Sequence, residues 1–118
     1  MDREALKERT KNFALRTIRL VAALPRNRVG EVLGGQVLKS GTSMGANYRE
    51  ALRASSKRHF LSTVKIVVRE SDETLYWLEL LAESNTVKPS RLSDLIRECT
   101  ELLAIFAKTA RSARQKPS

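Results

Sequence analysis

The chain has 118 residues, 42% hydrophobic and 30% charged, a mixture that is typical of one globular domain and excludes a chain disordered throughout. Its 22 Lys and Arg residues outnumber 13 Asp and Glu residues, so the net charge is +9. A single cysteine and a single histidine exclude an intrachain disulfide and a multi-cysteine zinc site, and they remove most of the usual catalytic groups.

No apolar run reaches the length of a membrane span, and residues 1–4 open into a charged helical pattern instead of an apolar leader. We therefore expect a cytosolic protein with no membrane partner. Because catalytic groups are scarce, we also predict that it is not an enzyme and that it takes no cofactor and no small-molecule substrate.

The first predicted helix covers about residues 4–24, where apolar and small side chains recur every three or four residues. Pro25 ends this segment. The stripe expected to face the core comprises Leu6, Thr10, Phe13, Thr17, Leu20, Val21 and Leu24.

The second segment, about 28–53, contains all five glycines of the chain. Each glycine inside a helix costs about 1 kcal/mol relative to alanine, so this density needs a structural reason. Either the helix breaks near Gly34-Gly35, or it continues and the glycines let a neighbouring helix or a bulky side chain approach. We favour a continuous helix because the apolar residues keep the same helical phase along the whole segment. That stripe comprises Val29, Leu33, Val37, Ser40, Met44, Asn47 and Ala51.

A third helix is predicted over about 57–84, after a turn at residues 54–56 where a serine caps the incoming helix. In a hairpin with this turn, Gly34 and Gly35 lie beside Tyr76 and Trp77, so the glycines would make room for the aromatic pair. The stripe of the third helix comprises Leu61, Val64, Val68, Ser71, Leu75, Leu78 and Ala82.

The fourth helix is predicted over about 89–112, with Pro89 in its first turn. Its stripe includes Cys99, which we interpret as a buried core thiol rather than a nucleophile. Four amphipathic helices joined by short loops predict an all-α fold, an antiparallel up-down-up-down four-helix bundle over residues 1–112, followed by a basic flexible tail over 113–118. The stripe comprises Leu92, Leu95, Cys99, Leu102, Phe106 and Ala110.

Two kinds of ligand site, a phosphate-binding loop and a di-metal centre, lack the sequence patterns that they require. The glycines lack the Gly-Lys-Ser/Thr sequence of a phosphate-binding loop. Carboxylates gather on the third helix, but the Glu-x-x-His pairs of a di-metal bundle are absent, so we predict no metal site. Instead, we expect Glu70 or Glu73 to accept hydrogen bonds from Ser40, Thr42, Ser43 or Asn47. The carboxylates are Glu70, Asp72, Glu73, Glu79 and Glu83.

The cations point to a nucleic acid, because in such a bundle they gather at the two ends. We expect Arg26 and Arg28 to lie near Lys88 and Arg91 at one end of the bundle. The remaining predicted binding residues, which are named below, are expected at the opposite end together with Lys116. Aromatic residues are few and mostly in core positions, so binding would follow the phosphate backbone with little sequence specificity. Alternatively, the cations serve only solubility. The predicted nucleic-acid-binding residues are Arg26, Arg28, Arg49, Arg53, Lys57, Arg58, Lys108, Arg111 and Arg114.

Two stretches together, residues 42–47 (TSMGAN) and 69–78 (RESDETLYWL), resemble the paired signature of the four-helix-bundle family named for 23S rRNA intervening sequences. Where many relatives continue with Ala-Glu-Gly, this chain reads Tyr48-Arg49-Glu50-Ala51, so we expect its turn to come later. The motif or interface residues that the resemblance assigns are Thr42, Ser43, Gly45, Asn47, Glu70, Glu73, Tyr76 and Trp77.

The resemblance implies a small cytosolic bacterial protein without catalytic residues that forms a ring-like homo-oligomer, typically a pentamer. A similar bundle is the accessory protein of diversity-generating retroelements, so RNA or a nucleoprotein is the implied partner. The alternative is a protein–protein adaptor or assembly module that does not bind nucleic acid directly.

Overall fold

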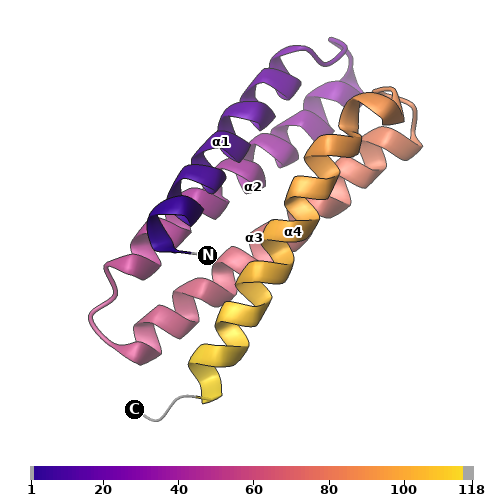
Figure 1. Cartoon of the computed structure of the whole chain (residues 1–118). Coiled ribbons are helices and arrows are strands. Elements are labelled where there is room, and N and C mark those ends of the chain that lie inside the picture. Colours follow the sequence, from indigo (N-terminus) through magenta and orange to yellow (C-terminus); the bar gives the residue numbers. More distant parts are fainter. Residues whose placement is uncertain (1, 116–118) are drawn as a thin grey trace.

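The computed structural model describes residues 2–115, which form four helices and no strand, and this confirms the predicted all-α class. The helices are α1 (Arg3–Ala22), α2 (Arg28–Leu52), α3 (Lys57–Glu83) and α4 (Pro89–Gln115). They form an elongated body of 49 × 20 × 20 Å, and Figure 1 shows the chain turning back on itself at each of the three loops. None of the described helices combines the length and apolarity that crossing a membrane requires.

Each helix begins where the sequence supplies a cap or a proline. The side chains of Asp2 and Asn27 accept hydrogen bonds from backbone N–H groups in the first turns of α1 and α2, at 2.7 and 2.9 Å. Ser56 does the same for α3, at 3.0 Å, which confirms the predicted serine cap. Pro89 occupies the first position of α4, where its missing N–H costs nothing.

The α2 helix is continuous through its glycines, as predicted, and Gly34, Gly41 and Gly45 face α1. A Cβ atom at Gly41 would lie 2.8 Å from Thr17 Cγ2, and one at Gly34 would lie 2.8 Å from Leu24 Cδ1. Residue numbers therefore rise along α2 as they fall along α1, so these two helices run in opposite directions. The glycines bring the two backbones close together.

The prediction that Gly34 and Gly35 make room for Tyr76 and Trp77 is wrong. Gly34 meets α1, and a Cβ atom at Gly35 would have no neighbour within 4 Å. Helix α2 meets α3 through Ser40 instead, whose Oγ accepts a hydrogen bond from Thr74 Oγ1 at 2.8 Å. Successive residues of a helix are turned by about 100°, so Ser40 and Gly41 face different neighbours.

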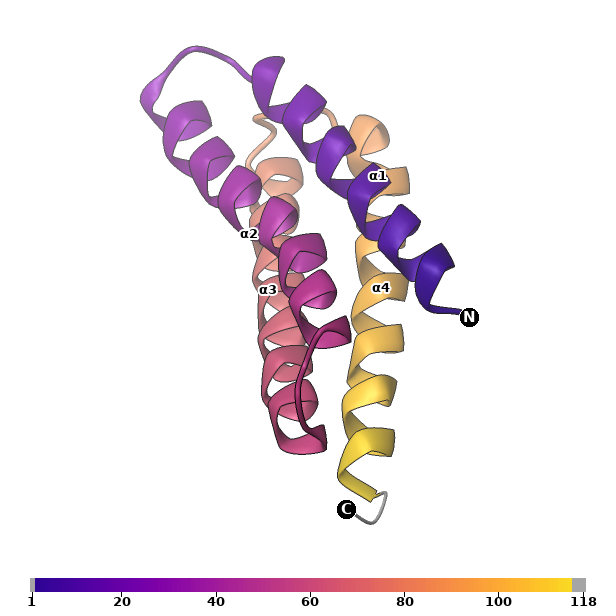
Figure 2. The ribbon, with the colours of Figure 1, turned by 90° about the vertical axis from the view of Figure 1, so that its left-hand side faces the viewer.

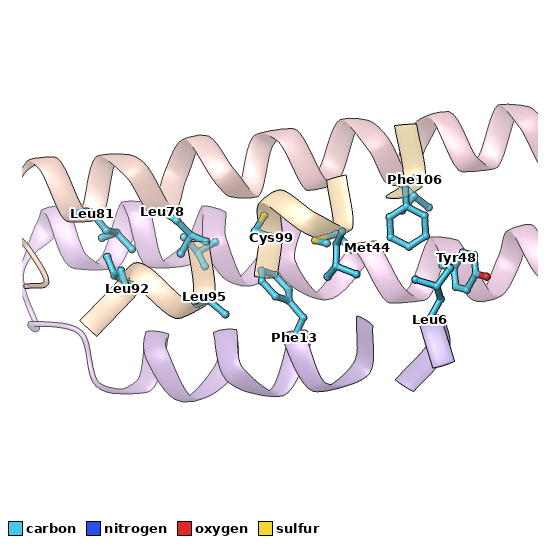
Figure 3. Packing of buried hydrophobic residues seen from close by; sticks show 14 of the residues in the cluster. Leu6, Phe13, Met44, Tyr48, Leu78, Leu81, Leu92, Leu95, Cys99 and Phe106 are labelled. Carbon is cyan, nitrogen blue, oxygen red and sulfur yellow. The ribbon is translucent and has the colours of Figure 1, made fainter. Parts of the chain in front are cut away.

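The core runs along the axis of the body and combines side chains from all four helices (Figure 3). The rings of Tyr48 and Phe106 pack with centroids 5.1 Å apart. Cys99 is fully buried, its Sγ donates to the carbonyl oxygen of Ser71 at 3.3 Å, and burial raises its pKa to about 12. Cys99 is thus a core thiol, as predicted, because burial disfavours the reactive thiolate.

Helix α4 continues three residues beyond its predicted end, to Gln115. Ala113 is buried, which explains why the helix does not stop at 112. Residues 113–115 therefore belong to the bundle instead of the predicted tail, whereas Lys116 lies outside the described residues.

Candidate nucleic-acid interface

The cations follow long stretches of sequence that contain no acid. Residues 9–30 hold six Lys or Arg and no Asp or Glu, and residues 51–69 hold five cations and no acid. In α4, every acid precedes residue 102, whereas Lys108, Arg111 and Arg114 follow it. This separation concentrates positive charge in α1 from Arg9 onward, around the turn between α2 and α3, and at the end of α4.

One basic hollow lies where the start of α1 meets the end of α2, at the end of the body that holds the α2–α3 turn (Figure 1). It measures about 290 Å³, and Arg49 and Arg53 line it together with Arg3 and Lys7 of α1. Glu4 also lines it and pairs with Lys7 at 3.5 Å. The structure thus brings together the predicted Arg49 and Arg53 and adds two cations from α1.

A second hollow at this end, of about 450 Å³, lies among the start of α1, the start of α3 and the last turns of α4. Arg3 and Lys108 both line it, and the Arg3 guanidinium lies 5.9 Å from the centre of the Phe60 ring. Arg3 therefore connects the two hollows. Among the residues predicted at this end, those that line neither hollow are Lys57, Arg58, Arg111 and Arg114.

The opposite end carries a larger cleft between α1 and α4, of about 640 Å³. Lys88 and Arg91 line it, but the predicted Arg26 and Arg28 do not. The other two cations on its wall, which sequence reasoning did not select, are Arg16 and Arg19 of α1.

The cleft exists because α1 runs obliquely to α4 (Figure 2). The two helices are connected near their middles, where Arg9 Nε donates to Glu98 Oε2 at 3.0 Å and Arg9 Nη2 lies 3.8 Å from Glu101 Oε1. The hydrogen bond to Glu98 is the largest cause that raises the pKa of Arg9 above its ordinary value. Arg9 therefore serves the scaffold, and the helices diverge on one side of it.

The motif residues of α2 satisfy their polar groups within their own helix. Thr42 Oγ1 donates to the Leu38 carbonyl at 2.7 Å, and Asn47 Nδ2 donates to the Ser43 carbonyl at 2.9 Å. Ser43 and Ser40 likewise donate to backbone carbonyls. The predicted hydrogen bonds to Glu70 or Glu73 are therefore wrong, because a carbonyl one turn away is closer than the next helix.

The motif residues of α3 differ in exposure: Glu73 and Tyr76 are exposed, whereas Glu70 and Trp77 are half-buried. Glu70 has an Arg69 nitrogen 3.6 Å away, while Tyr76 is 54% exposed and packs edge-on against Trp77, with ring centroids 5.1 Å apart. Within the described part of the chain, buried Trp77 Nε1 has no hydrogen-bond partner. The remaining motif residue, Gly45, faces Thr10 of α1.

The sequence reasoning missed Arg3, Lys7, Arg16 and Arg19 as candidate binding residues. The signal that would have found two of them was the acid-free stretch over residues 9–30. Arg3 and Lys7 were harder to find, because Glu4 and Glu8 alternate with them and only the packing of α1 on α2 brings them to Arg49 and Arg53.

The family model described as "23S rRNA-intervening sequence protein" matches residues 4–108. A crystal structure at 1.70 Å resolution is similar along nearly its whole length, with a TM-score of 0.87 and 32% sequence identity over 94% of this chain and 99% of that chain. It is described as a protein with unknown function from the S23 ribosomal protein family of Bacteroides thetaiotaomicron VPI-5482. No curated protein matches. The four-helix fold and the match over residues 4–108 show that the chain belongs to the 23S rRNA-intervening sequence protein family.

Proposed function

We propose that this protein is a non-enzymatic, cytoplasmic helical bundle that forms a ring-like homo-oligomer and binds RNA, alone or in a nucleoprotein, through its basic surface. The observation that carries the proposal is the pair of adjoining hollows at one end, which place Arg3, Lys7, Arg49, Arg53 and Lys108 around two neighbouring depressions. Such a set of cations binds the phosphate backbone and releases the counterions condensed on it.

The aromatic residues support recognition of the backbone rather than of the bases. Phe13 and Phe106 are fully buried and Tyr48 is 3% exposed, so these rings are unavailable for stacking on bases. Tyr76 is exposed, but exposed acids stand on both sides of it on α3, at Asp72 and Glu79. We therefore expect binding that depends on charge and RNA shape, with little sequence specificity.

Removing four cations from the proposed RNA-binding end is expected to weaken RNA binding by more than tenfold at about 100 mM salt, because each lost phosphate contact reduces the salt slope by about 0.7–0.9. The readout is an electrophoretic mobility shift with a structured RNA. The substitutions are Arg3→Gln, Arg49→Gln, Arg53→Gln and Lys108→Gln, all at cations that line the two hollows.

The control variant has the same change in net charge, but the cations that it loses lie on the flanks of the bundle instead of at the proposed RNA-binding end. If both variants lose affinity equally, the binding end has been assigned wrongly. The control substitutions are Lys39→Gln, Lys65→Gln, Arg69→Gln and Arg97→Gln.

A second candidate function, a protein–protein assembly module, is favoured by apolar side chains that α2 and α3 leave exposed. On α2, Val29 and Val32 are 51% and 53% exposed, and on α3 Tyr76 is 54% exposed. A second copy of the chain would cover such a surface in a ring. Light scattering is expected to give a multiple of the 13.3 kDa chain mass, and a strict monomer would contradict both the ring and the assembly module.

A further inference from the structure

The cleft between α1 and α4 has cations on both walls and an apolar floor. Arg16 and Arg19 stand one helical turn apart on α1, and Lys88 and Arg91 stand opposite them at the start of α4. Among the residues that the structure describes, no acid lines the cleft, whose volume of about 640 Å³ is within the range of small-ligand sites. The other lining residues are Leu20, Ala23, Leu24, Pro25, Asn85, Thr86, Val87, Leu92 and Leu95.

The loop that carries Lys88 is held in place by its own hydrogen bonds. Asn85 adopts a left-handed conformation, with φ of 59°, that ends α3, and the N–H of Val87 donates to the Leu81 carbonyl at 3.2 Å. The Arg91 N–H donates to the Lys88 carbonyl at 2.9 Å. This wall of the cleft is therefore built before any ligand arrives.

The four cations are not neutralised within the protein. Among residues 2–115, none of Arg16, Arg19, Lys88 and Arg91 forms an ion pair, whereas Arg9, which precedes them in α1, pairs with Glu98. Cations that face one another across a cleft repel each other, so they favour an anion between them. The apolar floor suits a flat, weakly polar group attached to that anion.

We propose that this cleft binds one nucleotide unit of an RNA strand, with its phosphate between the two pairs of cations and its base or ribose on the leucine floor. The inference rests on the proposed RNA-binding function and adds a second contact at the end opposite Arg49 and Arg53. A strand held at both ends would lie along the 49 Å length of the body.

The test compares two variants that lose the same charge. Arg19→Gln with Arg91→Gln removes one cation from each wall of the cleft, whereas Lys39→Gln with Lys65→Gln removes two exposed cations that line neither the cleft nor the two hollows at the other end. Affinity is measured by fluorescence polarisation with a labelled 12-nucleotide oligouridylate. We expect the cleft variant to bind about tenfold more weakly, with a salt slope reduced by about 1.4, and the control to change less than about twofold.

Equal loss of affinity in the two variants would overturn the cleft assignment, because net charge alone would explain it. A second cleft variant, Arg16→Gln with Lys88→Gln, is expected to behave like the first, and melting followed by circular dichroism confirms that all variants fold. An altered oligomer mass with unchanged RNA affinity would also overturn the proposal, since the cleft would then belong to a contact between copies of the chain.

Titration with uridine monophosphate and with inorganic phosphate separates this proposal from the proposed function. If the unmodified protein binds no RNA, the proposed function fails. The nucleotide site still stands if the protein binds uridine monophosphate more tightly than phosphate and loses that binding in the cleft variants. Absence of nucleotide binding as well would overturn the site. RNA binding that the cleft variants retain in full would overturn the site alone.

Discussion

Replacing Gly41 by valine is expected to lower the free energy of unfolding by about 3 kcal/mol, because the new side chain would overfill the contact between α1 and α2. Its Cβ atom alone would lie 2.8 Å from Thr17 Cγ2 and 3.2 Å from Thr17 Oγ1. Thr17 cannot easily turn away, since it is fully buried and its hydroxyl donates to the Ala14 carbonyl at 2.7 Å. Valine adds two methyl groups to this crowded position.

Gly35 provides the matched control on the same helix. A Cβ atom there would have no neighbour within 4 Å, so Gly35→Ala is expected to raise the free energy of unfolding by about 1 kcal/mol through helix propensity alone. Urea unfolding followed by circular dichroism measures both variants. Similar effects at the two positions would contradict the packing of α2 on α1 through its glycines.

Truncating Phe13 is expected to cost about 3–5 kcal/mol, since a large buried side chain is replaced by a cavity. Phe13 is fully buried and reaches from α1 into the core, toward Met44 and Cys99 (Figure 3). Domains of this kind are stable by only about 5–15 kcal/mol, so Phe13→Ala is expected to leave a marginal fold. The measurement is the midpoint of thermal unfolding.

Leu15 is the control for this truncation, because it lies on the same helix and is 41% exposed. Leu15→Ala is expected to cost less than about 1 kcal/mol. If both truncations shift the midpoint equally, α1 does not present Phe13 to the core in the way described.

The sequence predicted the helices well because, in most of the chain, the helical period of the apolar residues and the positions of the prolines indicate the same helix limits. In α1, the stripe from Leu6 to Leu24 is buried or half-buried, and Pro25 follows it directly. In α4, Pro89 begins the helix, and the predicted stripe is buried from Leu92 to Phe106. The largest difference is the end of α4, which the buried Ala113 extends, whereas α1 ends at Ala22, two residues before its predicted end.

The rotation of α2 was harder to predict because small residues, rather than large ones, face its neighbour. The stripe of large side chains placed Val29 toward the core, yet Val29 is 51% exposed and Gly30 is buried. A Cβ atom at Gly30 would collide with the Pro25 carbonyl oxygen, so the turn between α1 and α2 needs a glycine there. Close backbone contact replaces side-chain volume at this position.

The basic cleft was missed because it depends on how two helices cross and on one loop conformation. Arg16 and Arg19 are far from Lys88 and Arg91 in sequence, and only the oblique course of α1 opens space between them. In the α3–α4 loop, Asn85 adopts the left-handed conformation that glycine usually supplies, so no glycine marks this turn in the sequence. Neither feature leaves a periodic signal in the sequence.

The most direct test of the proposed function is the affinity of the unmodified protein for a structured RNA, measured between about 50 and 200 mM salt. If the basic end binds the phosphate backbone through at least four cations, the logarithm of the association constant is expected to fall with the logarithm of salt concentration with a slope of about −3 or steeper. Absence of binding at about 50 mM salt, or binding that does not change with salt, would contradict an electrostatic interface.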